Sequence, residues 1–445
     1  MTGCSGPVEG VQVDGGSGPS EPVTVTEDET SPPNWEVSAS PATVDFCKVA
    51  DGQSPELQQL PRGAMVNGRS LRGSVGFPFV PDRFPTTGTA RIVLGAVAFD
   101  DAPPSTESAR DFFSPHAEKM EEWADFWSQG QFALDITIID EWIEVPRRSV
   151  DMPSDDAQIA RIVQSHMPES TDFSGIDGTF VYWAEGTNGG NRHDFGVRVG
   201  SNENTYGDPA SRPDLFWGVA QYHIEDTGNG IPLSLKRDYM WSYLIHEIQH
   251  EQGLNTHSPG NGWQTGIGQN QYPDPSTGQW SAALASWELF LLGWINDEQV
   301  HCINPENLSA PENVILTAQE VYGGDRKIAV VPLSDADVLV VESRRPIGWT
   351  QGWDPTDAGL LVYTVNPRVE YIEDHEANDC GNTRDIPKWS YYLYVDGNAP
   401  AQCDYNDVDR VLVREGQTVT HEGIRVTLEY SAAEVDYVTI EAVTP

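Results

Sequence analysis

Basic residues are scarce in this chain of 445 residues. Lysine and arginine together number 26, and five of these are lysine, against 68 aspartate and glutamate residues. The formal net charge is −42, and it excludes nucleic acid as an expected partner because binding to phosphates requires clustered lysine and arginine. Dense carboxylates with little lysine are typical of a protein that works in salty surroundings, where salt screens their mutual repulsion.

Long apolar runs and calcium-binding loops are also missing. No stretch approaches the roughly 18 apolar residues of a membrane-spanning helix. We therefore expect a soluble chain that meets a membrane only if a lipid is attached to Cys4. We also expect it to be a monomer. No aspartate-rich loop matches a calcium-binding signature, so Ca²⁺ is at most a secondary cofactor beside the one proposed below.

Five cysteines, read by position, indicate an oxidising, extracellular or cell-surface compartment. Cys4 lies in MTGCSG, which resembles the end of a bacterial lipoprotein signal. A lipid anchor and a free thiol both stay open for it. The other four form an even set. We expect Cys380 to pair with Cys403 across a short loop, and Cys47 to pair with Cys302 by elimination.

Composition divides the chain into four parts with an overall α+β fold class. Residues 1–45 are rich in proline, serine, threonine and acid, which predicts a flexible tether. Residues 46–87 form a lead-in segment. Strand and helix patterns mix in residues 88–303, whereas residues 304–445 contain short β segments between turns, which predicts an all-β, sandwich-like domain.

Several elements are predicted within residues 88–303 from the spacing of apolar residues. They are a buried strand at 92–99, a helix ending at Gly130, a half-buried strand with Phe132, Leu134, Ile136 and Ile138 on one face, a helix at 154–167, a strand at 178–184 and a loop-dominated span at 185–232.

The stretch LIHEIQHEQGLNTHS, residues 244–258, carries the clearest chemistry. The pattern predicts a helix over residues 237–252, on which His246 and His250 project from one side because they are four apart. Two imidazoles at that spacing can hold one zinc ion. Glu247 lies beside the first histidine, where it can take a proton from a water activated by the zinc. This is the chemistry of peptide hydrolysis.

The context of the motif supports a metal site over a solvated helix that carries histidine by chance. Gly253 follows the motif, where the helix has to stop and the chain has to turn. His257 then supplies a third nitrogen just past the turn. The sequence thus predicts zinc on His246, His250 and His257, with Glu247 as the catalytic residue.

The run H-E-x-x-H-x-x-G-L, residues 246–254, resembles the zinc motif of the metzincin clan. The flanking segments are similar to the immune inhibitor A family of secreted bacterial metallopeptidases. ASWELFLLGWIND (285–297) resembles that family's helix ending in Leu-Gly-Trp, and VLVVESRRPIGWTQGWDPTDAGLLVYTVNP (338–367) resembles its strand–Glu-x-Arg–loop–Gly-Leu-Leu–strand passage. The resemblance covers roughly residues 88–367. It implies a metzincin-like zinc peptidase domain acting on a protein or peptide substrate.

Two positions depart from the clan's pattern. Thr256 stands where the clan has its third ligand, and a neutral hydroxyl is a poor zinc ligand. His257 is therefore our candidate, with Asp274 and Glu288 as alternatives that require longer excursions of the chain. All six methionines lie at or before Met240, so the methionine turn beneath the metal of that clan is absent or rebuilt without methionine.

Other polar residues have a structural interpretation that we favour. His193 and His223 are lone loop histidines, which are more often surface or hydrogen-bonding residues. Tyr272 is weighed as a phenol that stabilises an oxyanion, and is not among the predicted site residues. Glu342 and Arg344 predict a structural ion pair.

The sequence therefore favours a secreted or surface-anchored zinc endopeptidase. Two alternatives remain: an inactive zinc-containing binding or adhesion module, and a zinc hydrolase of a non-peptide substrate. The glutamate of the motif argues against the first, because a structural zinc site does not need it.

Overall fold

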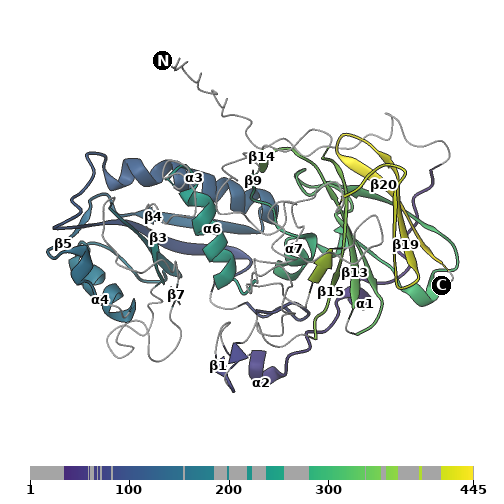
Figure 1. Ribbon diagram of the computed structural model, residues 1–445, viewed down its shortest axis with the longest axis horizontal. Helices are drawn as coiled ribbons and strands as arrows, with labels where there is room; N and C mark the ends of the chain where they lie inside the picture. The colour runs from purple at the N-terminus through teal and green to yellow at the C-terminus, as the bar shows by residue number, and fades with distance from the viewer. Residues whose placement is uncertain are drawn as a thin grey trace, which may run out of the picture.

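The computed structural model describes residues 35–443, except 59, 61–64, 68, 71–72, 82–83, 154–155, 185–197, 200–217, 223–236, 255–279, 336, 352–356, 369–389 and 393–411. Helices and strands mix up to about residue 300, and a β-rich region follows (Figure 1). The α+β class and the change to β structure are thus confirmed. Among the described residues, no helix has the length and apolar character needed to cross a membrane.

The first sheet contains six strands and is mostly parallel. Its order is β4-β3-β6-β8-β7, with β5 also beside β3, and only β7 runs antiparallel to its neighbour. Strand β3 is central, and every residue from Ile92 to Phe99 is buried, as a strand covered on both faces requires. The strands are β3 (Gly88–Phe99), β4 (Phe132–Ile138), β5 (Ile143–Val145), β6 (Gly178–Trp183), β7 (Arg198–Val199) and β8 (Gly218–Tyr222).

Three helices cover the two faces of this sheet. Ile92 and Leu94 of β3 belong to one apolar core with α3 (Ala109–Ser128) and α6 (Met240–Glu251). Val93 and Val97 face a second core with α4 (Asp156–His166). The side-chain hydroxyl oxygen of Ser108 caps α3 by accepting a hydrogen bond from the backbone N–H of Asp111. A 3₁₀ turn, η1 (Ser149–Asp151), precedes α4.

Two sheets build the β-rich region and share one apolar core. The first has the order β10-β12-β13-β15-β16 with β17 beside β15, and the second has the order β11-β20-β19-β18. Their strands are β10 (Val300–Cys302), β11 (Glu312–Thr317), β12 (Ile328–Pro332), β13 (Val338–Arg344), β15 (Gly359–Val365), β16 (Ser390–Tyr392), β17 (Leu412–Val413), β18 (Thr418–His421), β19 (Ile424–Ser431) and β20 (Val435–Ala442).

Helix α7 (Ser286–Leu292) links the two halves of the molecule. Its apolar residues lie in the same core as α3 and α6, and that core also contains Val340 and Leu361 of the β-rich region. The predicted boundary at residues 303 and 304 therefore crosses a continuous core. Short elements flank α7 along the chain: β9 (Trp280–Ser281) precedes it and pairs with β14 (Thr350–Gln351), and the 3₁₀ turns η3 (Asp297–Gln299) and η4 (Pro305–Asn307) follow it.

The described N-terminal residues lie against the β-rich region. The backbone N–H of Ser38 donates to the carbonyl of Asn313, and that of Ala42 donates to the carbonyl of Cys302. Cys47, at the end of α1 (Val44–Cys47), forms a disulfide with Cys302, which confirms this predicted pair. Three short elements follow: α2 (Pro55–Gln58), β1 (Met65–Val66) and β2 (Arg69–Ser70). The predicted pair Cys380–Cys403, and Cys4, lie outside the described residues.

Candidate functional site

Helix α6, drawn beside α3 in Figure 1, carries the histidine–glutamate motif, and all of its described side chains are buried. Its bounds, Met240–Glu251, confirm the predicted helix, which forms because Leu244, Ile245 and Ile248 bury an apolar side in the core that α3 and α7 share. His246 and Glu247 are 3% and 6% exposed. Neither side chain lies on a solvent-exposed surface. The motif is therefore not on the solvated face of a helix that carries histidine by chance.

Burial extends all the way round this helix. Six polar side chains of α6 and its C-terminal end are buried: Ser242, His246, Glu247, Gln249, Glu251 and Gln252. Burying a polar or ionised group costs free energy unless it is paired or coordinates a metal. A helix that served packing alone would place apolar residues here. The concentration of buried polar groups therefore marks α6 as the candidate site.

The C-terminal end of α6 is fixed at the residue where the sequence predicts a turn. Gly253 has φ +99°, a conformation that favours glycine. The backbone N–H of Leu254 donates to the carbonyl of Gln249 at 3.0 Å, the long closing bond of a Schellman end. The side-chain amide of Gln252 donates to the carbonyl of Pro85 at 3.1 Å, which ties the helix end to the segment entering β3.

The structure describes only part of the predicted zinc site. The backbone of His250 lies in α6 one turn after His246, and therefore on the same side of the helix; its side chain is not among those described. His257 and Thr256 lie outside the described residues. So do Asp274, Tyr272, His193 and His223.

Glu288, an alternative third ligand, lies in α7. Its side chain is 1% exposed. Burial raises the pKa of Glu288 well above its usual value, and the nearby carboxylate of Glu342 adds to the rise. The charge of Glu288 is also among the causes that raise the pKa of Tyr363. Glu288 thus lies close to Glu342 of β13 and Tyr363 of β15, in low-dielectric surroundings that disfavour its charged form.

Glu342 and Arg344 form the predicted structural ion pair, which is confirmed. Nη1 of Arg344 lies 2.9 Å from Oε1 of Glu342, and its Nη2 lies 2.7 Å from Glu320. All three side chains are buried. Glu342 also accepts from the backbone N–H of Ser286 at 2.7 Å. The pair therefore holds the start of α7 against β13.

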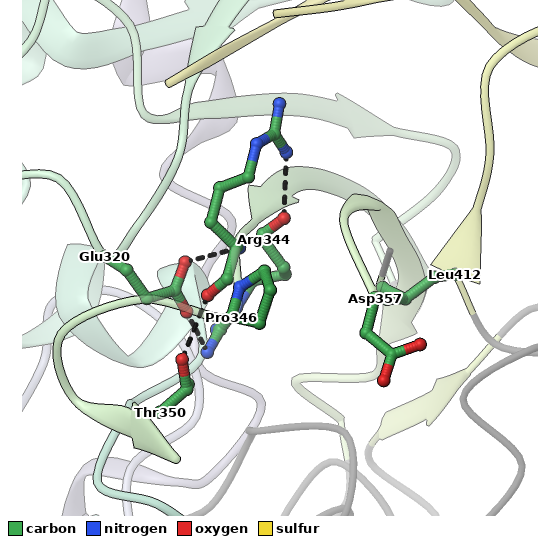
Figure 2. Close-up of a pocket in the computed structure, with 7 residues that line it drawn as sticks. Glu320, Arg344, Pro346, Thr350, Asp357 and Leu412 are labelled. Atoms are coloured by element: carbon green, nitrogen blue, oxygen red, sulfur yellow. Dashed lines mark hydrogen bonds and ion pairs between the residues drawn. The ribbon is translucent and has the colours of Figure 1, made fainter. Parts of the chain in front are cut away.

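A small pocket opens beside this ion-pair network. Figure 2 shows Glu320, Arg344 and Thr350 on one side of it and Asp357 and Leu412 on the other. The space admits only a water-sized molecule. Its charged groups already have partners: Arg344 pairs with Glu320, Arg345 with Asp436 at 2.7 Å, and Asp357 with Arg414 at 3.1 Å. The pocket belongs to the scaffold.

A second group of metal-binding residue types lies in the β-rich region. Potential ligand atoms of Asp337, His421 and Glu422 all lie within 4.8 Å of one another. Nε2 of His421 is 3.1 Å from Oδ2 of Asp337, and this hydrogen bond raises the pKa of His421. Sequence inspection missed the group because its members are 84 residues apart and follow no short motif. The only signal was a histidine at the end of a β segment, before a Glu-Gly turn.

No protein-family model matches this chain, and no curated protein matches it.

Proposed function

We propose that this chain is a zinc endopeptidase of the metzincin type, similar to the immune inhibitor A family. The observation that carries the proposal is the burial of His246 and Glu247 on a helix that ends at Gly253 directly after the motif. A buried imidazole next to a buried carboxylate, followed by a turn that can bring a third ligand back, is the arrangement that the motif requires.

Glu247 favours an enzyme over a structural zinc module. A carboxylate that is 6% exposed costs free energy relative to an apolar residue at the same place. Zinc held for structure alone needs only its ligands. A buried glutamate directly beside the first of them is therefore better explained by a proton-transfer role.

The segments that resemble the family meet one another, which also supports the proposal. The helix of ASWELFLLGWIND is α7, and the strand of VLVVESRR is β13. They are joined by the bond from the Ser286 N–H to Glu342 and by the bond from Arg344 to the carbonyl of Leu284 at 3.2 Å. Helices α6 and α7 lie in one core.

The donor set fits zinc. The helix places His246 and His250 one turn apart, and imidazole nitrogens are preferred zinc ligands. His257 is the proposed third ligand, and a position left for water makes the site catalytic rather than closed. When bound, zinc polarises the substrate carbonyl and makes the attacking water more acidic.

Each residue of the proposed site then has a defined role. The two histidines of α6, with His257, hold the metal. Glu247 takes the proton from the attacking water as the new C–O bond forms, and then gives that proton to the leaving amine nitrogen as the C–N bond breaks. The packed core behind α6 keeps the carboxylate in place relative to the histidines.

We further infer an extracellular or cell-surface location with protein or peptide substrates. The Cys47–Cys302 disulfide supports an oxidising compartment. Whether Cys4 carries a lipid, which would anchor the chain to a membrane, is decided by mass spectrometry of the N-terminal peptide from the native source.

The first test replaces Glu247 with glutamine. We expect zinc to stay bound while cleavage of casein falls at least about 100-fold, since general acid–base catalysis contributes about 10² to 10⁴. The matched control is Glu251→Gln, on the same helix and equally buried at 6%, for which we expect near-normal cleavage per folded molecule. Near-normal cleavage by Glu247→Gln would refute the mechanism.

The second test locates the third ligand. We expect His257→Ala to bind zinc much more weakly and to lose peptidase activity, whereas Thr256→Ala changes little. Zinc content and casein cleavage are measured on both variants. If His257→Ala keeps full zinc and activity while Asp274→Ala or Glu288→Ala loses both, the assignment of His257 is wrong.

A further inference from the structure

We propose that Asp337, His421 and Glu422 form a second metal site, for a divalent transition-metal ion such as Zn²⁺, that ties together the two sheets of the β-rich region. This turn site is separate from the motif of α6 and does not depend on the proposed peptidase activity.

The three residues come from two turns that belong to different sheets. Asp337 directly precedes β13, and its carbonyl accepts from the N–H groups of Leu333 and Ser334, which fixes the β12–β13 turn. His421 ends β18 and pairs with Ile424 of β19. Glu422 therefore occupies a two-residue turn with Gly423, and the two have φ angles of +43° and +79°. Bringing these turns together places ligand atoms of one imidazole and two carboxylates within 4.8 Å of one another.

The spacing suits one ion. Zinc lies about 2.0 to 2.2 Å from nitrogen and oxygen ligands, so two ligands of a tetrahedral site are about 3.4 Å apart. Nε2 of His421 and Oδ2 of Asp337 are 3.1 Å apart. The Glu422 ligand atom lies within 4.8 Å of both, and its exposed side chain can close the remaining gap by rotating.

The charge balance also favours a cation. Two carboxylates face one imidazole, and among the described residues no lysine or arginine forms an ion pair with Asp337 or Glu422. Ca²⁺ and Mg²⁺ prefer all-oxygen sites. A nitrogen ligand with two carboxylates suits Zn²⁺ and its transition-metal neighbours. Three protein ligands leave at least one position for water, so the ion should exchange readily with solvent.

The experiment measures zinc bound by the full chain without a histidine tag. Zinc is counted after equilibrium dialysis in high salt, which screens loose binding to the acidic surface. In the His246→Ala/His250→Ala background, which removes the proposed catalytic metal, we expect one zinc equivalent to remain. Adding His421→Ala should remove it. Adding Glu422→Gln, an exposed and nearly isosteric change, should weaken it, because a neutral amide is a poorer zinc ligand than a carboxylate. The control is His166→Ala, an exposed histidine at the end of α4.

The outcomes separate the two metal sites. No zinc in the His246→Ala/His250→Ala background, or an equivalent that survives both His421→Ala and Glu422→Gln, would overturn the turn site and leave the peptidase proposal standing. A full equivalent in the wild-type chain that only His421→Ala removes would support the turn site and contradict zinc on α6. Displacement of the bound zinc by excess Ca²⁺ would overturn the transition-metal assignment. Co²⁺ substitution gives the same count by its visible absorption.

Discussion

His116 shows how a single buried group couples this fold to pH. It lies in α3, is 7% exposed and packs edge-on against Phe112. Burial lowers the pKa of His116 to about 4, and the charge of Arg237 contributes to the fall. His301 in β10 behaves alike, because burial lowers its pKa to about 4 as well. Both imidazoles are therefore neutral in the folded protein at pH 7.

This predicts loss of stability on mild acidification. In the unfolded chain a histidine binds a proton near pH 6.5, whereas folded His116 binds one only near pH 4. The unfolded state therefore gains protons first, and the stabilisation present above pH 6.5 is lost as the pH falls towards 4, at about 3 kcal/mol for each such histidine. Denaturant unfolding at pH 7, 5.5 and 4 should show a smaller loss for His116→Gln than for the wild type. The control is the exposed His166→Gln. If the free energy of unfolding depended equally on pH in both variants, the prediction would be contradicted.

At the scale of one element, the end of α6 decides whether the motif can work. Gly253 and Gly293 both adopt positive φ at the ends of helices, at +99° and +80°. A β-carbon in that conformation costs about 1 to 2 kcal/mol. Of the two glycines, only Gly253 lies between the two histidines of α6 and His257 in the sequence. Substituting each glycine in turn therefore distinguishes the loss of stability caused by backbone strain from an effect on the proposed metal site.

We therefore expect Gly253→Ala and Gly293→Ala to lower the free energy of unfolding by similar amounts, about 1 kcal/mol each. Only Gly253→Ala should also weaken zinc binding and peptide cleavage, because it disturbs the path to the third ligand. Open space surrounds a β-carbon at Gly293, which makes it a clean control. Equal, near-normal activity for the two folded variants would argue against a ligand just past the turn.

The helices and strands differ in how well the sequence predicts them. The sequence predicted α3 and the buried part of β3 closely, because α3 repeats apolar residues at helical spacing over many positions and β3 contains a continuous apolar run. Strands β7 and β8 lie within a span predicted to be loop-dominated. They are two and five residues long among glycine, asparagine and proline, so local composition outweighed the pairing that the sheet provides.

The candidate sites show the same division. His246 and Glu247 could be found because their chemistry follows a short spacing along one helix. The turn site could not, since Asp337 and His421 meet only after two sheets have packed. Apolar patterning also cannot reveal that one core passes across residues 303 and 304 through α7. The Cys47–Cys302 disulfide could be predicted because elimination among the few cysteines left few possible partners.

For the whole molecule, the dominant quantity is the net charge of −42. Its cost is visible on the outer side of α3, where burial raises the pKa of Glu121, and Asp135 and Glu118 raise it further by repulsion. A protein with so much charge of one sign is destabilised by self-repulsion, which salt relieves. Stability should therefore depend on ionic strength over the entire surface rather than at one pair.

We predict that the thermal midpoint rises steeply as NaCl is added to a low-salt buffer, with most of the rise below about 1 M, where the Debye length has shrunk to about 3 Å. The shape matters, because solute exclusion from the surface would instead continue to stabilise the protein at higher concentration. NaCl and KCl should give the same curve, while sucrose of matched osmolality should lack the early rise. A midpoint that is flat or falls between low salt and 1 M would mean that the acidic residues are too well separated for their repulsion to govern the stability of the fold.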